Sequence, residues 1–313
     1  MGDPGGIGPE VSLKAALDKR VLAICEPVVV GSRAALEAHA KASRLSLGSI
    51  RFLETEPRPF QIGDIDAEHG LAALDAARTA IQGAMAGQYQ AVVAAPHSET
   101  AIHAAGVAFD GYPSFVARTT GLAPEEGILM LCFPHAGREV RIAHVTLHTS
   151  VRHAMEMIST ERVLATLRAA DQALKRMGCE QPKIAVGAIN PHAGEGGLFG
   201  DDEASSVVPA IEAARAEGIV ADGPIAADTL LQRAGYDAYV VMLHDHGHIP
   251  AKLLAPNAAA ALTIGTPVLF SSVAHGAAFD IAGQNRADPA AMVEAITRLA
   301  GRRRRAPPTA KMD

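Results

Sequence analysis

Three histidines stand just past apolar runs that look like β-strands, where side chains are placed to do chemistry. They are His148, His192 and His244. The carboxyl ends of strands in an open α/β sheet line one crevice, so we expect these imidazoles to converge although they are far apart in the sequence. Three neutral imidazoles suit a zinc-like divalent ion that keeps one coordination position open. The alternative is that each is an ordinary turn residue, since some of the 13 histidines must follow strands by chance.

The segment His244-Asp245-His246-Gly247-His248 is the densest of these positions. Asp245 can hydrogen-bond to a metal-binding imidazole and so orient it. Gly247 is expected to let the backbone turn sharply beneath the ion. His246 and His248 are equally consistent with solvated side chains.

Two further polar residues flank the run that leads to His244. Asp228 precedes this run and Lys252 follows it. A lysine near a metal ion is a candidate proton donor, which makes the pair candidates for a catalytic role. The alternative is that both are surface charges, as most such residues are.

A second candidate site follows the apolar run 268–272. His275, Gly276, Asp280 and Gly283 lie there in one short segment of small residues. Small residues permit close approach of a planar ring, and a carboxylate accepts hydrogen bonds from ribose hydroxyls. The segment therefore indicates a dinucleotide site.

The glycine-rich turn 2–8 opens the chain. It is either a phosphate-binding loop or a tight turn that packs a helix against a sheet. Such a turn normally follows a strand, which raises the question whether the native N-terminus lies upstream of Met1.

The elements that must position these residues alternate along the chain. Apolar runs and helix-length stretches rich in Ala, Leu, Glu and Arg follow one another, which is typical of parallel strands joined by crossover helices. Strands are predicted at 26–30, 90–95, 183–189, 238–243 and 268–272, and helices at 9–18, 70–86, 160–177, 205–217 and 289–300. The runs 127–133 and 139–147 favour an antiparallel hairpin. The fold class is therefore α/β with a mixed sheet.

Composition narrows the function classes. The formal charge of −6 and the pI near 6.1 give no basic face for nucleic acid, and the one basic cluster, Arg302 to Arg305, is expected in a solvated tail. Three cysteines without CxxC spacing suit a reducing compartment. No apolar run is long enough to span a membrane and no signal pattern opens the chain, so we expect a cytoplasmic protein.

Six motifs together resemble the 4-hydroxythreonine-4-phosphate dehydrogenase family of pyridoxal phosphate biosynthesis. They are GDPGGIGPE, Thr146-Leu147-His148, NPHAGEGG, DGPIAADTL, MLHDHGHIPAK and HGAAFDIAG, in the family's order. The resemblance implies a three-layer isopropylmalate-dehydrogenase-like fold with two α/β domains. Residues 1–112 together with 256–313 form the first domain and residues 113–255 the second, with the active site in the cleft between them.

The resemblance also implies a site and a reaction. A divalent metal (Zn, Mg, Mn or Co) is held by His148 and His192 of one subunit and His244 of its partner in a homodimer, and Asp228, Asp245 and Lys252 match active-site positions. NAD, or alternatively NADP, oxidises a hydroxyl β to a carboxylate, and the β-keto acid then loses carbon dioxide. The implied substrate is a small hydroxy-carboxylate.

Departures from the family pattern bear on the substrate. Where the family binds a phosphate with lysine, histidine-threonine, asparagine and arginine, this chain carries His97, Tyr112, Ala261 and Phe270. The pattern looks closer to the terephthalate dihydrodiol dehydrogenase branch, whose substrate is a carboxylated cis-dihydrodiol, and Tyr112 and Phe270 suit the wall of an apolar ring pocket. The alternatives are the phosphorylated-threonine enzyme or a related phospho-hydroxyacid dehydrogenase, a zinc hydrolase, and a binding protein without activity.

Overall fold

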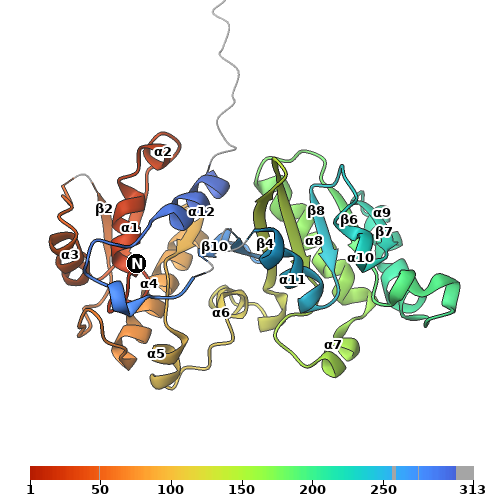
Figure 1. Ribbon diagram of the computed structural model, residues 1–313, viewed down its shortest axis with the longest axis horizontal. Coiled ribbons are helices and arrows are strands. Elements are labelled where there is room, and N and C mark those ends of the chain that lie inside the picture. The colour runs from red at the N-terminus through yellow and green to blue at the C-terminus, as the bar shows by residue number, and fades with distance from the viewer. Residues whose placement is uncertain (49, 256–258, 274, 301–313) are drawn as a thin grey trace, which may run out of the picture.

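The computed structural model describes residues 1–48, 50–255, 259–273 and 275–300 of the chain. Helices and strands alternate, and a long twisted sheet runs through the molecule with helices packed on it (Figure 1). The strands are β1 (Val28–Gly31), β2 (Arg51–Glu54), β3 (Val92–Ala94), β4 (Ile128–His135), β5 (Arg138–His144), β6 (Lys183–Gly187), β7 (Val220–Ile225), β8 (Ala238–Val241), β9 (Ala260–Ile264) and β10 (Phe270–Val273). The predicted α/β class is confirmed.

The α-helices connect and cover these strands. They are α1 (Gly8–Ala16), α2 (Lys19–Leu22), α3 (Arg33–Ala42), α4 (Ala67–Met85), α5 (Glu99–Ala104), α6 (Tyr112–Thr119), α7 (Val151–Met157), α8 (Thr160–Arg176), α9 (Val208–Ala216), α10 (Ala227–Leu230), α11 (His244–Leu254) and α12 (Ala290–Ala300). Several begin at a side-chain cap; Ser159, for example, accepts a hydrogen bond from the Arg162 amide at the start of α8.

Eight strands form the main sheet in the order β3-β10-β9-β4-β5-β8-β6-β7. β4 and β5 form the predicted antiparallel hairpin, and β9 is antiparallel to both of its neighbours. β5, β8, β6 and β7 run parallel to one another. The predicted mixed sheet is confirmed, and β1 and β2 form a separate parallel pair.

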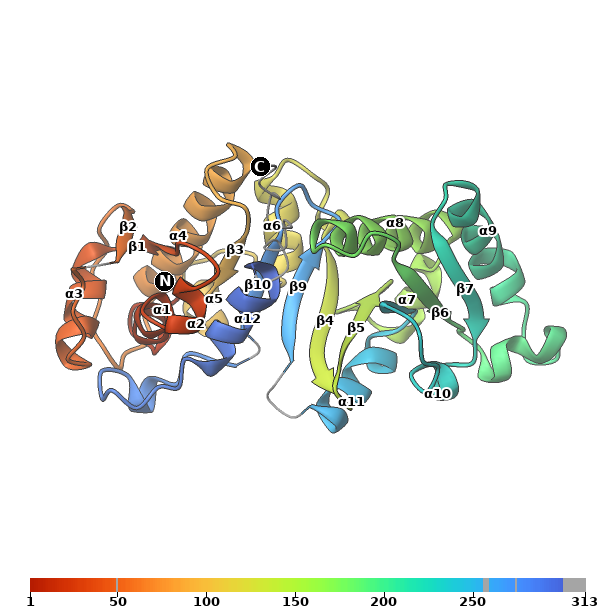
Figure 2. The same cartoon turned by 90° about the horizontal axis from the view of Figure 1, so that it is seen from above.

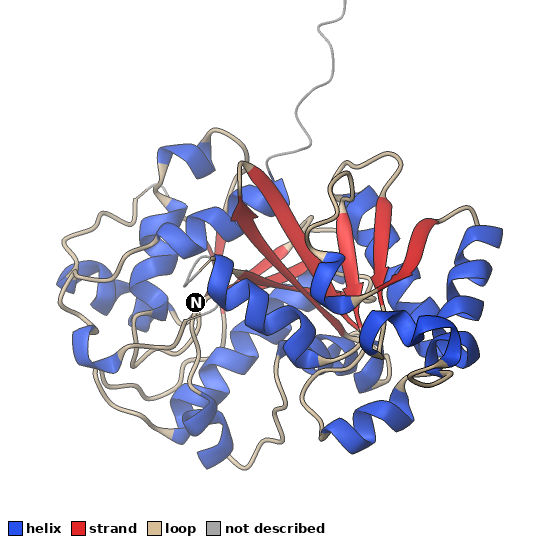
Figure 3. Cartoon of the chain, turned by 45° about the vertical axis from the view of Figure 1, so that its right-hand side comes forward, coloured by secondary structure: helices blue, strands red, loops and turns tan. Residues whose placement is uncertain are grey.

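Alternating residues of the strands pack into two different cores, which makes the architecture three-layered. Ile184 and Val186 of β6 face the core that contains α8, whereas Ala185 faces the core that contains Ala251 of α11. Figure 2 shows α8 on one side of the sheet and α10 and α11 on the other, and Figure 3 shows the strands between the two helical layers.

The ends of the described chain lie together. Helix α12 contacts α1 and α2, so the first and last segments share one side of the molecule. This is the arrangement expected for a discontinuous first domain, although the boundaries at 112 and 255 stay a prediction. The basic cluster 302–305 lies outside the described residues, and none of the described helices is both long and apolar enough to cross a membrane.

Candidate active site

The three predicted metal-binding histidines follow three adjacent parallel strands. His148 follows β5, His244 follows β8 and His192 follows β6, and β8 lies between the other two. The carboxyl ends of parallel strands share one edge, so all three histidines lie at the same edge of the sheet, as the sequence predicts.

Two of these histidines form a pair. The ring centroids of His148 and His244 are 5.7 Å apart, and the His248 ring stacks on His244 at 3.8 Å and 9°. His244 also donates a hydrogen bond from Nδ1 to a carboxylate oxygen of Asp245 at 2.7 Å, the contact that the sequence suggested. We call His148, His244 and Asp245 the paired-histidine site.

The third histidine lines a separate pocket of about 330 Å³, which we call the His192 pocket. Its walls are Ile189, Asn190, Pro191, His192, Ala227, Asp228 and His246. The structure therefore brings Asp228 to His192, whereas Lys252 is exposed on α11, one turn after His248. A solvated His246 was one of the alternatives from the sequence, but this side chain is half-buried. Its Nδ1 atom has no hydrogen-bond partner among the described residues.

The loop that carries His192 has an unusual backbone. Residues 192–196 all have positive φ, between 45° and 77°, and three of them, His192, Ala193 and Glu195, are not glycine. Left-handed backbone is costly for residues with a Cβ atom, so the surrounding structure must hold the loop in place. Such strain often accompanies binding sites.

The carboxylate of Glu203 fixes the start of this loop by hydrogen bonds. Glu203 was not among the residues predicted from the sequence. One carboxylate oxygen accepts hydrogen bonds from the backbone N–H groups of Ile189 and Asn190 at 2.8 and 2.6 Å, and the other accepts one from Asn190 Nδ2 at 3.0 Å. Burial alone would raise the pKa of Glu203, but the hydrogen bonds from Asn190 and Ile189 hold it below its ordinary value. The sequence signal was only that an acidic residue comes 16 positions after Gly187, the last residue of β6.

The prediction of a sharp turn at Gly247 is wrong, because this glycine lies inside helix α11. A Cβ atom there would lie 2.3 Å from Nε2 of His144. Gly247 is therefore required for close packing of the helix on the buried His144 ring. Burial lowers the pKa of His144 to about 3, so this imidazole is neutral beneath the paired-histidine site.

The side chains at the site supply some, but not all, of the ligands that a divalent metal ion needs. Because Nδ1 of His244 donates its hydrogen to Asp245, Nε2 keeps a lone pair that can bind a metal ion. A second imidazole beside it and a carboxylate that orients it are typical of zinc sites. Within one chain, however, the described residues contain no cluster of three histidine, cysteine or acidic side chains able to hold a metal. The His192 side chain is 69% exposed and so is accessible to a second molecule.

The predicted dinucleotide segment packs on the glycine-rich turn. Ile7 donates a backbone hydrogen bond to the Ala277 carbonyl at 2.8 Å, and a Cβ atom on Gly6 would lie 2.5 Å from that same oxygen. Gly283 has a φ of 70° and approaches Ile62 closely. His275 is half-buried, Gly276 faces open space, and Asp280 is exposed. The carboxylate of Asp280 is thus accessible to a ligand.

The residues that replace the phosphate-binding positions are largely buried. His97 packs edge-on against Tyr112, with ring centroids 4.7 Å apart, and burial lowers its pKa. Phe270 is fully buried in the core beside Val92, and Tyr112 is 5% exposed. The expectation that Phe270 lines a substrate pocket is therefore wrong, because β10 lies inside the sheet and its first residue faces the core.

Comparisons with known proteins agree with this architecture. The family model described as "Pyridoxal phosphate biosynthetic protein PdxA" matches residues 23–299. A 1,2-dihydroxy-3,5-cyclohexadiene-1,4-dicarboxylate dehydrogenase of a Comamonas species is 44% identical over 303 residues, which cover 96% of this chain and 95% of the relative.

Solved structures give the same result. A terephthalate 1,2-cis-dihydrodiol dehydrogenase from Burkholderia xenovorans matches with a TM-score of 0.77 and 41% identity, covering 96% of both chains. A 4-hydroxythreonine-4-phosphate dehydrogenase from Burkholderia phymatum matches with a TM-score of 0.83 and 33% identity, also covering 96% of both. A β-decarboxylating dehydrogenase from Thermococcus kodakarensis, with a TM-score of 0.54 and 18% identity over 95% of this chain and 80% of its own, shows the shared isopropylmalate-dehydrogenase-like fold. The chain therefore belongs to the PdxA family and is an oxidoreductase of the dehydrogenase type.

Proposed function

We propose that the protein oxidises a hydroxyl β to a carboxylate with NAD, and that its substrate is an unphosphorylated carboxylated cis-dihydrodiol. The observation that carries this proposal is the 44% identity, over nearly the whole chain, to a dehydrogenase named for such a compound. The substitutions at the phosphate-binding positions support it. A neutral His97 and an Ala261 side chain offer no charge to a phosphate dianion.

The proposed reaction removes a hydride from the carbinol carbon and a proton from its oxygen, which leaves a ketone and NADH. The carboxylate β to this ketone then leaves as carbon dioxide, its bonding electrons pass to the ring, and aromaticity is restored. A divalent ion bound at the site would polarise the substrate oxygen and so favour both steps. The alternative of a zinc hydrolase has no support from the family match.

The paired-histidine site is the proposed anchor for that ion. Asp245 holds the His244 ring in one orientation through the Nδ1 hydrogen bond, so Nε2 keeps its lone pair for the metal. Asp228 and Lys252 are the proposed proton-transfer groups; Asp228 lies beside His192 in the pocket, and Lys252 projects from the helix that carries His244.

We infer further that two copies of the chain complete each site. In one chain His148 lies beside His244, whereas His192 lines a separate pocket, so we propose a different division of the ligands from the one that the family resemblance implies. The geometry favours His148 and His244 from one chain and His192, with Asp228, from the other. Exposed apolar side chains, which an interface between two chains would cover, lie in or next to the elements that carry both half-sites; they are Val151, Leu198, Phe199, Ile249 and Leu253.

The segment from His275 to Gly283 is the proposed NAD site. The exposed Asp280 carboxylate is suited to accept hydrogen bonds from the ribose hydroxyls of NAD. The same carboxylate would repel the 2′-phosphate of NADP, so NAD is the expected cofactor. The backbone around it is fixed by the contact between Ile7 and Ala277.

The decisive experiment is to follow NADH formation with Mg, Mn and Zn supplied in turn. The substrates are 1,2-dihydroxy-3,5-cyclohexadiene-1,4-dicarboxylate and 4-phosphohydroxythreonine. We expect turnover of the dihydrodiol, release of one carbon dioxide per NADH, and loss of at least about 100-fold in kcat/KM in His244→Ala. Turnover of the phosphorylated substrate alone would show that the second candidate, a phospho-hydroxyacid dehydrogenase as in the Burkholderia phymatum relative, is correct.

A further inference from the structure

Helix α11 carries His248, a histidine to which the proposed function gives no role. His244 is the first residue of α11 and His248 comes four residues later, which places both side chains on the same side of the helix. The two rings are stacked, with centroids 3.8 Å apart and planes inclined by 9°. The ring of His248 therefore covers one face of His244, a proposed metal ligand.

The ring of His248 is fixed by two contacts of its own. Its Nδ1 atom donates a hydrogen bond to the backbone carbonyl of His244 at 3.2 Å. The ring of His144 lies against it, with centroids 4.8 Å apart and planes inclined by 53°. His144 is buried, and its own Nδ1 donates a hydrogen bond to the Leu129 carbonyl of β4 at 3.3 Å. The contacts thus run from the sheet through two imidazoles to His244.

The stacked arrangement excludes His248 as a ligand of the ion that His244 binds. The lone pair of an imidazole nitrogen lies in the plane of the ring, and zinc binds along it at about 2.0–2.1 Å. Because the two ring planes are nearly parallel and their centroids are 3.8 Å apart, an ion in the plane of one ring lies far outside the plane of the other. His248 is thus placed to support His244 and not to share its metal ion.

The hydrogen bond to Asp245 constrains the His244 ring only in part. It decides which edge of the ring carries the N–H group, but a single hydrogen bond lets the ring plane tilt about it. The Asp245 side chain is also 74% exposed, so water competes for this bond and its net contribution is small. The stacked ring of His248 opposes the tilt that the hydrogen bond allows, because a tilted His244 ring would run into it.

We propose that His248 is a positioning residue, which fixes the plane of the His244 ring by stacking and so keeps Nε2 aimed at the metal ion. Asp245 selects the nitrogen that is free, and His248 fixes the direction in which that nitrogen points. Direction matters because the lone pair that binds the metal lies in the ring plane. This inference rests on the metal anchor of the proposed function, since it assigns a role to the neighbour of one of its ligands.

The test separates the ring of His248 from its hydrogen bond. His248→Phe keeps a flat ring without the bond to the His244 carbonyl, His248→Asn keeps a hydrogen-bond donor without the ring, and His248→Ala loses both. In calorimetric titrations we expect zinc affinity to fall about tenfold to 100-fold in the Ala and Asn variants, and by less than about threefold in the Phe variant. His103→Ala, which removes an exposed imidazole of α5, is the control and should bind zinc as the wild type does.

Two results of these titrations would overturn the proposal. One is equal zinc affinity in the wild type and His248→Ala. The other is an affinity that follows the unfolding temperature of the three variants instead of the presence of a ring, because His248 would then only pack the helix.

A measurement on the metal-free protein keeps this inference distinct from the proposed function. At a pH of about 8, where ordinary histidines are neutral, the NMR shifts of the His244 ring nitrogens report which one carries the hydrogen. We expect one sharp set of signals with the hydrogen on Nδ1 in the wild type and in His248→Phe, and signals broadened by exchange in His248→Ala.

The two measurements together assign any failure. If the wild type binds no zinc while His248→Ala still broadens the His244 signals, the metal anchor of the proposed function fails and the positioning role stands. If zinc binds but the His244 signals are the same in the wild type and His248→Ala, the positioning role fails and the metal anchor stands.

Discussion

The Nδ1 atom of His244 lies 2.7 Å from a carboxylate oxygen of its neighbour Asp245, and this contact fixes which nitrogen of the ring is free. Asp245→Asn keeps the shape of the side chain but weakens the hydrogen bond. We expect metal affinity to fall about tenfold to 100-fold with little change in unfolding temperature, measured by calorimetric titration with zinc. Unchanged affinity would remove Asp245 from the site.

Mixing inactive variants tests how two chains share the ligands. A mixture of His148→Ala and His192→Ala chains should regain activity, because one site of each mixed dimer contains only intact ligands. A statistical mixture gives about a quarter of the wild-type rate. A mixture of His148→Ala and His244→Ala should stay inactive, since these residues are neighbours in one chain. The reverse pattern would favour the division that the family resemblance implied.

Glu203 is expected to act through the His192 loop. Glu203→Ala leaves two backbone N–H groups without their acceptor, which costs about 2–3 kcal/mol in the free energy of unfolding. The loop should then fail to hold His192, so zinc affinity should fall with stability, while Glu203→Gln should be intermediate. The exposed Glu212→Ala is the control, and a loss of stability without a loss of zinc affinity would limit Glu203 to a structural role.

Gly247→Ala tests the packing of α11. The added methyl group would meet Nε2 of His144 at 2.3 Å, so either the helix or the buried ring must move. We expect a loss of about 1–3 kcal/mol in chemical denaturation. Gly48→Ala, where the nearest atom is 3.8 Å away, should change stability little. Equal effects of the two substitutions would contradict this account of Gly247.

His39 makes stability depend on pH. Burial lowers its pKa, although its Nε2 lies 2.9 Å from the Pro4 carbonyl, so the folded protein keeps the ring neutral where the unfolded chain binds a proton. The free energy of unfolding should therefore fall as the pH drops below about 6.5, by up to about 1.4 kcal/mol per pH unit for this group, until the folded pKa is reached. His39→Gln should reduce that slope, whereas the exposed His103→Gln should leave it unchanged. Parallel slopes for wild type and His39→Gln in urea titrations would contradict the assignment.

The ends of the buried parallel strands could be predicted from the sequence, because each such strand is a continuous apolar run. His148, His192 and His244 were expected at strand ends, and all three are there because buried parallel strands are continuous apolar runs. Strands β7 and β9 were not predicted. β7 contains Gly223 and Pro224, which usually interrupt strands, and the residues of β9, 260–264, include two alanines, which favour helix.

Helix α11 was missed for the same reason as β7. Gly247 and Pro250 lie inside it, and both normally weaken helices, so the segment was interpreted as a turn. Tertiary packing on His144 outweighs these local preferences. The separation of His192 from His148 was also beyond the sequence, because it depends on the left-handed loop and on Glu203, which no spacing rule reveals.

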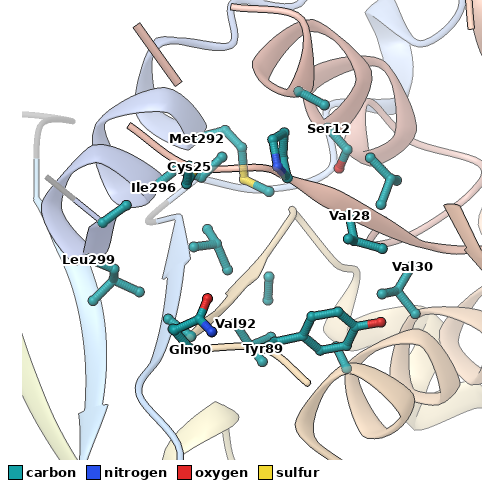
Figure 4. Close-up of a pocket in the computed structure, with 18 of the residues that line it drawn as sticks. Ser12, Cys25, Val28, Val30, Tyr89, Gln90, Val92, Met292, Ile296 and Leu299 are labelled. Atoms are coloured by element: carbon teal, nitrogen blue, oxygen red, sulfur yellow. The ribbon is translucent and has the colours of Figure 1, made fainter. Parts of the chain in front are cut away.

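The cavity of about 550 Å³ between β1 and β3 (Figure 4) has a consequence for solubility, because among the described residues β1 pairs only with β2 and β3 only with β10. An open sheet edge invites unlimited addition of strands from other molecules, which is one origin of aggregation. Here the two unpaired edges face each other, and α4 and α12 wall the space between them. These two helices therefore shield the facing edges from successive pairing with strands of other molecules.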